Sequence, residues 1–203
     1  ISHDLDEAMR IGDRIAIMKD GMVVQVGTPE EILREPADEY VRNFIRGVDT
    51  AAVFKAGDIA RKTQVEVSES PTRGCRPALK RLQQHDRDWG YVVSSNNRYL
   101  GTVSATSLSG ALRGHEGPLG LRNAFVPGVE AVSAEVPIAE LYSLMVDCPC
   151  PLPVVDPETE RFLGVISKTT LLKFLDPTTD PHGNPLPELP EQAETQIAPE
   201  PTV

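Results

Sequence analysis

Apolar residues near the N-terminus change from helical to strand spacing within the first 27 positions. A helical pattern predicts a short helix that stops near Gly12. Two β-rich runs, over 14–18 and 22–26, flank the turn-forming pair Asp20-Gly21 and predict a hairpin. A helix and a two-stranded ribbon are therefore expected at the start of the chain.

A second helix is predicted directly after the hairpin. Thr28 stands at the N-cap position, Pro29 at the first helical position, and Glu31 three residues after the cap, the arrangement of a capping box. Pro36 ends this helix, and apolar residues over 40–45 predict another short amphipathic helix. The first unit is expected to end near residue 47.

An internal repeat dominates the second half of the chain. Residues 99–108 match residues 162–171 without a gap, and each copy follows a second β-rich run, at 91–93 or 152–155. Each also has a helical pattern upstream and a short leading strand. The pattern predicts two β-α-β-β-α units that pack together, because one alone buries its sheet poorly.

The helix expected before residue 152 has an apolar face that is predicted to pack on the sheet. Ile138, Leu141, Leu144 and Met145 recur at helical spacing, and all four are expected to face the sheet.

Composition agrees with a soluble globular protein, and the order of predicted elements gives the α/β class. The chain has 203 residues, of which 40% are hydrophobic and 25% charged. It contains no apolar run of the roughly 20 residues that a transmembrane helix needs, and no signal peptide. From Pro177 onward the sequence is rich in proline and acidic residues and is expected to be disordered.

Charge is unevenly distributed along the chain. The net charge of −10 argues against nucleic-acid binding. Residues 61–98 are nevertheless net positive, whereas residues 122–176 are net negative. The basic run is either an ordinary solvated face or a surface that binds anions, with anionic lipid as a candidate partner.

The three cysteines, Cys75, Cys148 and Cys150, have no zinc-site spacing, and their odd number argues against a secreted disulfide scaffold. A redox or metal site is one interpretation of the Cys-Pro-Cys sequence. We favour the other, in which both are buried small side chains at a helix-to-strand turn, and predict no metal site.

The segment from Ser2 to Ala8, Ser-His-Asp-Leu-Asp-Glu-Ala, resembles the switch-histidine segment of ABC-transporter ATPases, and the resemblance continues through residues 13–18 and 24–29. It implies a catalytic role for His3, whose imidazole would donate a hydrogen bond to the γ-phosphate of ATP. Asp4 and Glu7 are interpreted instead as helix-start carboxylates.

Other parts of an ABC ATPase site are missing from this sequence. It contains neither a phosphate-binding loop nor an acidic strand end for Mg²⁺, and it opens without Met in what resembles the middle of a domain. We expect a fragment that does not hydrolyse ATP alone. ATP and Mg²⁺ would bind in the complete subunit.

The repeated unit resembles a pair of cystathionine-β-synthase-type (CBS) domains. An ABC ATPase followed by a CBS pair is the arrangement of quaternary-amine importer ATPases, and residues 46–49 and 58–62 also resemble that subfamily. The resemblance implies that residues 1–47 are the C-terminal end of the ATPase domain and 48–57 a connector. Residues 58–114 would form repeat 1, 115–176 repeat 2, and 177–203 the acidic tail.

The resemblance also suggests a ligand site. CBS pairs commonly bind adenine nucleotides through a Ser or Thr, with an Asp three residues later, and Ser104 and Ser167 match the first position. Ser107 and Thr170 stand where the Asp would be, which argues against tight AMP or ATP binding. A cyclic dinucleotide is an alternative ligand, and helix capping is the structural alternative for both serines.

The function implied is regulation of an ATP-driven glycine betaine/proline betaine importer, with the CBS pair sensing ionic strength or a nucleotide. The implied partners are membrane permease subunits, a second ATPase copy and a substrate-binding protein. The implied location is peripheral, on the cytoplasmic face of the inner membrane. A cationic face would act as the salt sensor, and its residues are Arg73, Arg76, Lys80 and Arg81.

Two alternatives from other classes remain. A stand-alone CBS-pair regulator would have no transport role, but the ABC-like string from Ser2 to Glu31 argues against it. An independent enzyme would need an acid–base pair or an activated nucleophile, and neither arrangement is visible.

Overall fold

The computed structural model describes residues 1–2, 4–69 and 74–174. The first part of the chain is a hairpin packed with three short helices. Its elements in chain order are α1 (Leu5–Ile11), β1 (Ile15–Lys19), β2 (Met22–Gly27), α2 (Pro29–Arg34) and α3 (Glu39–Phe44). The antiparallel pairing of β1 with β2 confirms the predicted hairpin.

The capping box predicted for α2 is confirmed. The Glu31 amide donates to the Thr28 hydroxyl at 3.2 Å, and the Thr28 amide donates to the Glu31 carboxylate at 2.9 Å. Two of the amides left without partners at the helix start are thereby satisfied. Two single-turn helices follow as the connection to the repeats, α4 (Thr50–Val53) and α5 (Ala56–Ile59).

Each repeat builds a three-stranded mixed sheet. Repeat 1 consists of β3 (Val65–Ser68), α6 (Cys75–Gln84), β4 (Trp89–Val93), β5 (Tyr99–Ser104) and α7 (Ala105–Leu112). Repeat 2 consists of η1 (Leu121–Ala124), β6 (Val132–Ser133), α8 (Ile138–Asp147), β7 (Leu152–Val155), β8 (Phe162–Ile166) and α9 (Lys168–Phe174). In both, the first strand lies parallel to the second and the second antiparallel to the third. The predicted α/β fold with two β-α-β-β-α repeats is confirmed.

The segments that lead into the repeats are exchanged. Arg61, upstream of repeat 1's sheet, pairs with Val165 of β8, whereas Phe125, upstream of repeat 2's sheet, pairs with Val103 of β5. The glycine repeated in the sequence makes room for each crossing. A Cβ on Gly101 would lie 2.6 Å from the Phe125 ring, and one on Gly164, whose φ is +152°, would lie 2.7 Å from the Arg61 carbonyl oxygen.

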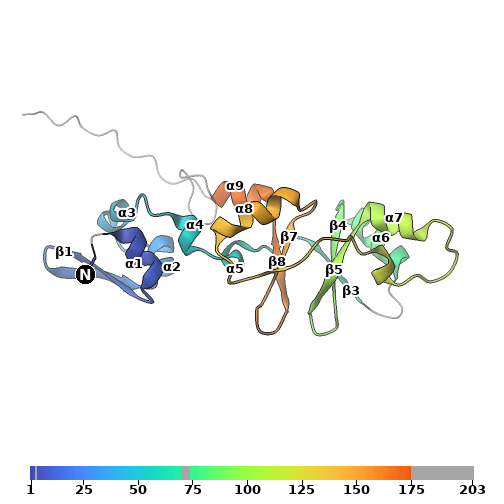
Figure 1. Cartoon of the computed structure of the whole chain (residues 1–203), viewed down its shortest axis with the longest axis horizontal. Helices are drawn as coiled ribbons and strands as arrows, with labels where there is room; N and C mark the ends of the chain where they lie inside the picture. The colour runs from blue at the N-terminus through green and yellow to red at the C-terminus, as the bar shows by residue number, and fades with distance from the viewer. Residues whose placement is uncertain (3, 70–73, 175–203) are drawn as a thin grey trace, which may run out of the picture.

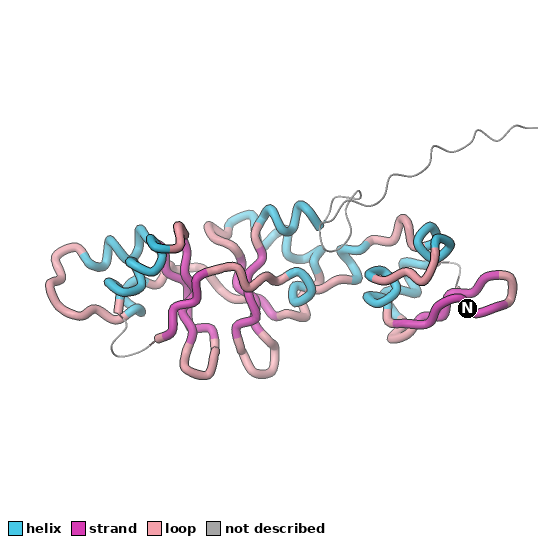
Figure 2. The backbone as a smooth tube through the Cα atoms, turned by 180° about the vertical axis from the view of Figure 1, so that it is seen from behind, coloured by secondary structure: helices cyan, strands magenta, loops and turns pink. Residues whose placement is uncertain are grey.

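Repeat 2 lies between the N-terminal part and repeat 1, although it comes last in the sequence (Figures 1 and 2). One hydrophobic core runs through the N-terminal part, the connection and repeat 2, and it includes Ile32, Phe54, Ile138 and Ile166. Repeat 1 has its own core around Leu82 and Leu108. The N-terminal part and repeat 2 therefore share one packing unit, and repeat 1 is attached to it.

One prediction about side-chain burial is wrong. Leu144 is 46% exposed, whereas Ile138, Leu141 and Met145 are buried. At 100° per residue, those three lie within about 60° of one another on α8, and Leu144 lies well to one side of them. The stripe that α8 buries is narrower than the apolar pattern suggested. Among the described residues, none of the helices is long and apolar enough to span a membrane.

Candidate functional site

His3 lies outside the described residues, and the structure describes only its neighbours. Asp4 is the N-cap of α1, where its carboxylate accepts a hydrogen bond from the Glu7 amide at 3.0 Å. The Ser2 hydroxyl also accepts from the Asp4 amide, at 3.0 Å. Asp4 is thus the helix-start carboxylate that the sequence predicted, and His3 comes directly before this cap.

Ser104 begins α7 through a reciprocal capping box. The Ser107 amide donates to the Ser104 hydroxyl, and the Ser104 amide donates to the Ser107 hydroxyl, both at 2.9 Å. Ser104 is buried, so its hydroxyl is held inside the protein. Ser107, which stands where the nucleotide-binding pattern of CBS pairs has an Asp, closes the cap.

Ser167 begins α9 in the equivalent way. The Thr170 amide donates to the Ser167 hydroxyl at 3.0 Å, and the two side-chain hydroxyls lie 2.8 Å apart. The structure therefore gives both candidate serines a capping role, at matching places in the two repeats. A role for either in binding a ligand stays a prediction.

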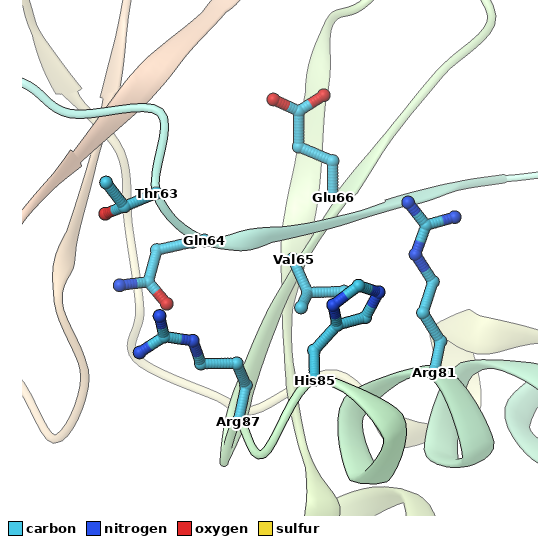
Figure 3. Close-up of a pocket in the computed structure, with 7 residues that line it drawn as sticks. All are labelled: Thr63, Gln64, Val65, Glu66, Arg81, His85 and Arg87. Carbon is cyan, nitrogen blue, oxygen red and sulfur yellow. The ribbon is translucent and has the colours of Figure 1, made fainter.

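A cationic pocket lies beside repeat 1, where β3 begins and α6 ends. It is an open cavity of about 330 Å³ lined by Thr63, Gln64, Val65, Glu66, Arg81, His85 and Arg87. Figure 3 shows the Arg87 side chain reaching towards Gln64, with Arg81 standing along β3 beyond His85. Val65 points towards α6 and Glu66 points to the opposite side of the strand (Figure 3).

The order of elements explains why these cations gather there. Arg81 lies in the last turn of α6 and His85 is its C-cap, and positive charge is favoured at a helix C-terminus by the helix dipole. Arg87 follows in the loop to β4. The lining residues include two guanidinium groups but one carboxylate, that of Glu66, so the pocket can hold an anion of phosphate size.

Sequence reasoning found this pocket only in part. Arg81 and Arg87 belong to the predicted basic stretch, but nothing pointed to His85 or Gln64. The basic residues gathered around the end of a predicted helix were the available signal. The approach of residues 63–66 depends on the parallel pairing of β3 with β4, which the pattern of one strand does not reveal.

The cationic face predicted from the sequence is only partly free. Arg73 lies outside the described residues. Arg76 donates a hydrogen bond to the backbone carbonyl of His115 at 2.9 Å, so it also ties α6 to the loop after α7. Lys80 and Arg81 are exposed on α6. Arg87, in the loop after α6, is exposed as well, and we call Lys80, Arg81 and Arg87 the cationic edge.

The two sheets meet through aromatic side chains. Tyr91 of β4 and Phe162 of β8 stack with their ring centroids 5.5 Å apart, and Tyr99 lies on Phe162 at 6.1 Å. The Tyr91 hydroxyl donates to the Pro151 carbonyl at 2.6 Å. Burial raises the pKa of Tyr99 to about 12. This contact holds repeat 1 against repeat 2.

Comparison with known proteins supports both resemblances. The CBS domain family matches residues 124–177. The glycine betaine/proline betaine transport system ATP-binding protein ProV of Escherichia coli K12 is 52% identical over 177 residues, which is 87% of this chain and 43% of ProV. The glycine betaine transport ATP-binding protein OpuAA of Bacillus subtilis is 36% identical over 176 residues, covering 86% of this chain and 40% of OpuAA. The chain spans less than half the length of these relatives.

Solved structures support the fold of the repeats. A CBS domain pair/ACT domain protein from Thermotoga maritima matches with a TM-score of 0.50 and 24% identity, over 60% of this chain and 96% of that one. The CBS pair of a Mg²⁺ transporter described as putative, from Shewanella oneidensis, matches with a TM-score of 0.52 and 16% identity, over 60% and 70%. These structures establish the CBS-pair fold alone. The sequence relatives show that the chain is homologous, over 87% of its length, to glycine betaine/proline betaine transport ATP-binding proteins, and its residues 124–177 match the CBS domain family.

Proposed function

We propose that this chain is the C-terminal regulatory part of the ATP-hydrolysing subunit of an osmoprotectant ABC importer, with glycine betaine or proline betaine as the substrate. The observation that carries the proposal is the 52% identity over 177 residues to a relative named for that transport. A stand-alone CBS regulator would not account for the helix, hairpin and capped helix that precede the repeats.

In the complete subunit, His3 acts at the ATP site. Its imidazole donates to the γ-phosphate, while the rest of the subunit supplies the phosphate-binding loop and the ligands of Mg²⁺. The Asp4 cap fixes the start of α1. The subunit pairs with a second copy and with membrane permease subunits on the cytoplasmic face of the membrane, and a substrate-binding protein delivers the osmolyte.

Regulation follows from the charge of repeat 1. At low ionic strength the cationic edge binds anionic lipid or an acidic protein surface and holds the ATPase in a less active arrangement. Salt screens such contacts over a Debye length of about 8 Å at physiological strength. Each basic residue near an anionic surface contributes about 1 kcal/mol to the free energy of binding. The three residues together therefore change the ratio of surface-bound to free molecules by about two powers of ten.

A second regulatory input is a phosphate-bearing ligand in the pocket of Figure 3. The observation that favours it is the approach of Arg81, His85 and Arg87 around one cavity of about 330 Å³. The volume admits a phosphate and a sugar, whereas a whole dinucleotide would extend beyond it. Calorimetry with AMP, ATP and cyclic dinucleotides separates this input from a purely electrostatic one.

The transport function is tested with the complete subunit reconstituted with its permease and binding protein in vesicles. ATP-driven uptake of glycine betaine is expected, and His3→Ala should reduce it strongly while nucleotide binding persists, because a contact to the γ-phosphate acts mainly in the transition state. His115→Ala, at an exposed histidine in the loop after α7, is the matched control and should keep wild-type uptake. Vesicles that take up no quaternary amine would contradict the proposal.

A further inference from the structure

Two cysteines meet at the turn between α8 and β7. Cys148 is the C-cap of α8, and Cys150 follows one proline later, two residues before β7 begins. Their sulfur atoms are 3.8 Å apart, close enough for one thiol to donate to the other. Cys148 is half-buried, whereas Cys150 is only 4% exposed. One thiol can therefore meet a small molecule from solvent, and the other lies directly behind it.

The thiol pair lies at the contact between the repeats. The next residue, Pro151, accepts the hydrogen bond of Tyr91, which is fully buried in repeat 1. Burial, followed by the neighbouring Cys148, raises the pKa of Cys150 to about 12. The raised pKa lowers the thiolate fraction of Cys150, and Cys148 is the more exposed of the two thiols, so the first reaction with a co-reactant falls to Cys148.

We propose that Cys148 and Cys150 are a reversible thiol–disulfide site whose closure loosens the contact between repeat 1 and repeat 2. The bond would close a ring over a single intervening residue. Disulfides with such constrained geometry are labile and are found at regulatory positions more than at structural ones. A reducing compartment holds the pair as thiols, and oxidising conditions close it.

The co-reactant is a low-molecular-weight disulfide. The Cys148 thiolate attacks one of its sulfur atoms, forming a mixed disulfide and releasing one small thiol. The Cys150 thiol then gives up its proton and attacks the Cys148 sulfur, which expels the second small thiol. One protein S–S bond forms, two S–H bonds are lost, and the co-reactant is reduced to two thiols.

Closure must move the turn. The sulfur atoms have to approach from 3.8 Å to about 2.05 Å, and Pro151, whose carbonyl holds Tyr91, directly follows the second cysteine. Trp89 is the single tryptophan of the chain and packs against the cluster that contains Tyr91 and Phe162. Its fluorescence therefore reports on the contact between the repeats.

The test uses the 203-residue chain with Cys75→Ser, which removes the third thiol and keeps a donor to the Gly120 carbonyl. Treatment with a small disulfide should remove two hydrogen atoms from the intact mass and block alkylation of both cysteines. Dithiothreitol should reverse both changes. Cys150→Ser should stop at the mixed disulfide on Cys148. A wild-type pair that stays alkylatable, stops at the mixed disulfide or links two chains instead would overturn the site.

Coupling to the repeat contact has its own readout. Oxidation should change Trp89 fluorescence reversibly, and Tyr91→Phe, which removes the hydroxyl that reaches Pro151, should at least halve that change while the disulfide still forms. An equal change in Tyr91→Phe, or none in the parent, would show that closure does not act through this contact.

Discussion

At the scale of single residues, helix caps could be predicted from the sequence, whereas the cationic pocket could be predicted only in part. Thr28, Ser104 and Ser167 each cap a helix, and each was recognisable from its spacing to a polar residue three positions later. The residues of the cationic pocket were harder to find, because His85 and Gln64 come from separate elements and meet only in the folded chain. Capping is a local property, whereas a pocket depends on tertiary contacts.

Replacing Ser104 by Ala should lower the free energy of unfolding by about 1 kcal/mol, because the Ser107 amide loses its acceptor. Ser104→Thr should restore most of it. Ser109→Ala removes an exposed hydroxyl within the same helix, α7, and is the matched control, with an expected change below about 0.5 kcal/mol. Urea unfolding measures all three, and equal stability of Ser104→Ala and the parent would refute the capping role.

The buried thiol of Cys150 should make stability depend on pH. Its pKa is raised from 9.0 to about 12 in the folded chain, so its stabilising effect is complete below 9.0 and is lost as pH rises towards 12. The stability difference between wild type and Cys150→Ala should therefore shrink above pH 9.0. Urea unfolding on either side of this value measures it, and a difference independent of pH would contradict the assignment.

At the scale of elements, α5 links the N-terminal part to the repeats through one ion pair. The Arg34 guanidinium donates to the Asp58 carboxylate at 2.6 Å, and Asp58 also accepts from the Lys55 amide at the start of α5. Arg34 in addition lies over the Phe54 ring, 5.3 Å from its centroid. One carboxylate thus caps a helix and ties α2 to it.

Asp58→Asn should reduce the free energy of unfolding by about 1–3 kcal/mol, because a partly buried charge-assisted hydrogen bond is lost. The Lys55–Glu135 pair, at 2.6 Å, offers the control because both side chains are more exposed. Glu135→Gln should cost less than about 1 kcal/mol, since exposed ion pairs contribute little. If both variants lose the same stability, the linking role of Asp58 is wrong.

The elements themselves were largely predictable, whereas their crossings were not. Alternating residues and a turn pair identified the hairpin, and the gapless repeat identified the two equal sheets. In the exchange between the repeats, Arg61 pairs with Val165, about a hundred positions away in the sequence. No local sequence pattern encodes a pairing over that separation. The sequence feature that accompanies this exchange is the pair of repeated glycines, Gly101 and Gly164, which make room for the crossing segments.

At the scale of the whole molecule, the shared core makes repeat 2 the physical neighbour of the N-terminal part (Figure 1). Phe54 is fully buried there and meets Phe174 of α9 edge to face, with centroids 5.2 Å apart. Packed residues join repeat 1 to the N-terminal part through the aromatic contact between the sheets and then through this core, and we predict that a change in repeat 1 is transmitted along them. The test of this route is whether substitutions in repeat 1 and in the N-terminal part are energetically coupled.

Phe54→Ala should destabilise the chain by about 3–5 kcal/mol and speed hydrogen exchange in both α2 and β8. Leu82→Ala, in the separate core of repeat 1, should instead speed exchange in β3 and β4. Mass spectrometry of exchanged peptides compares the two variants. Identical exchange patterns would show that the chain has a single cooperative core.

The central claim is that the CBS pair adjusts osmoprotectant transport to ionic strength, and it is tested most directly by uptake across a series of salt concentrations. The complete subunit, reconstituted with its permease in vesicles containing anionic lipid, would carry Lys80→Gln, Arg81→Gln and Arg87→Gln together. A control with the same charge change would carry Arg10→Gln, Arg42→Gln and Arg161→Gln, at exposed positions elsewhere. We predict that the first variant takes up glycine betaine at low salt nearly as fast as at high salt, while the control keeps the wild-type dependence. Salt dependence of the first variant that matches wild type would contradict the account.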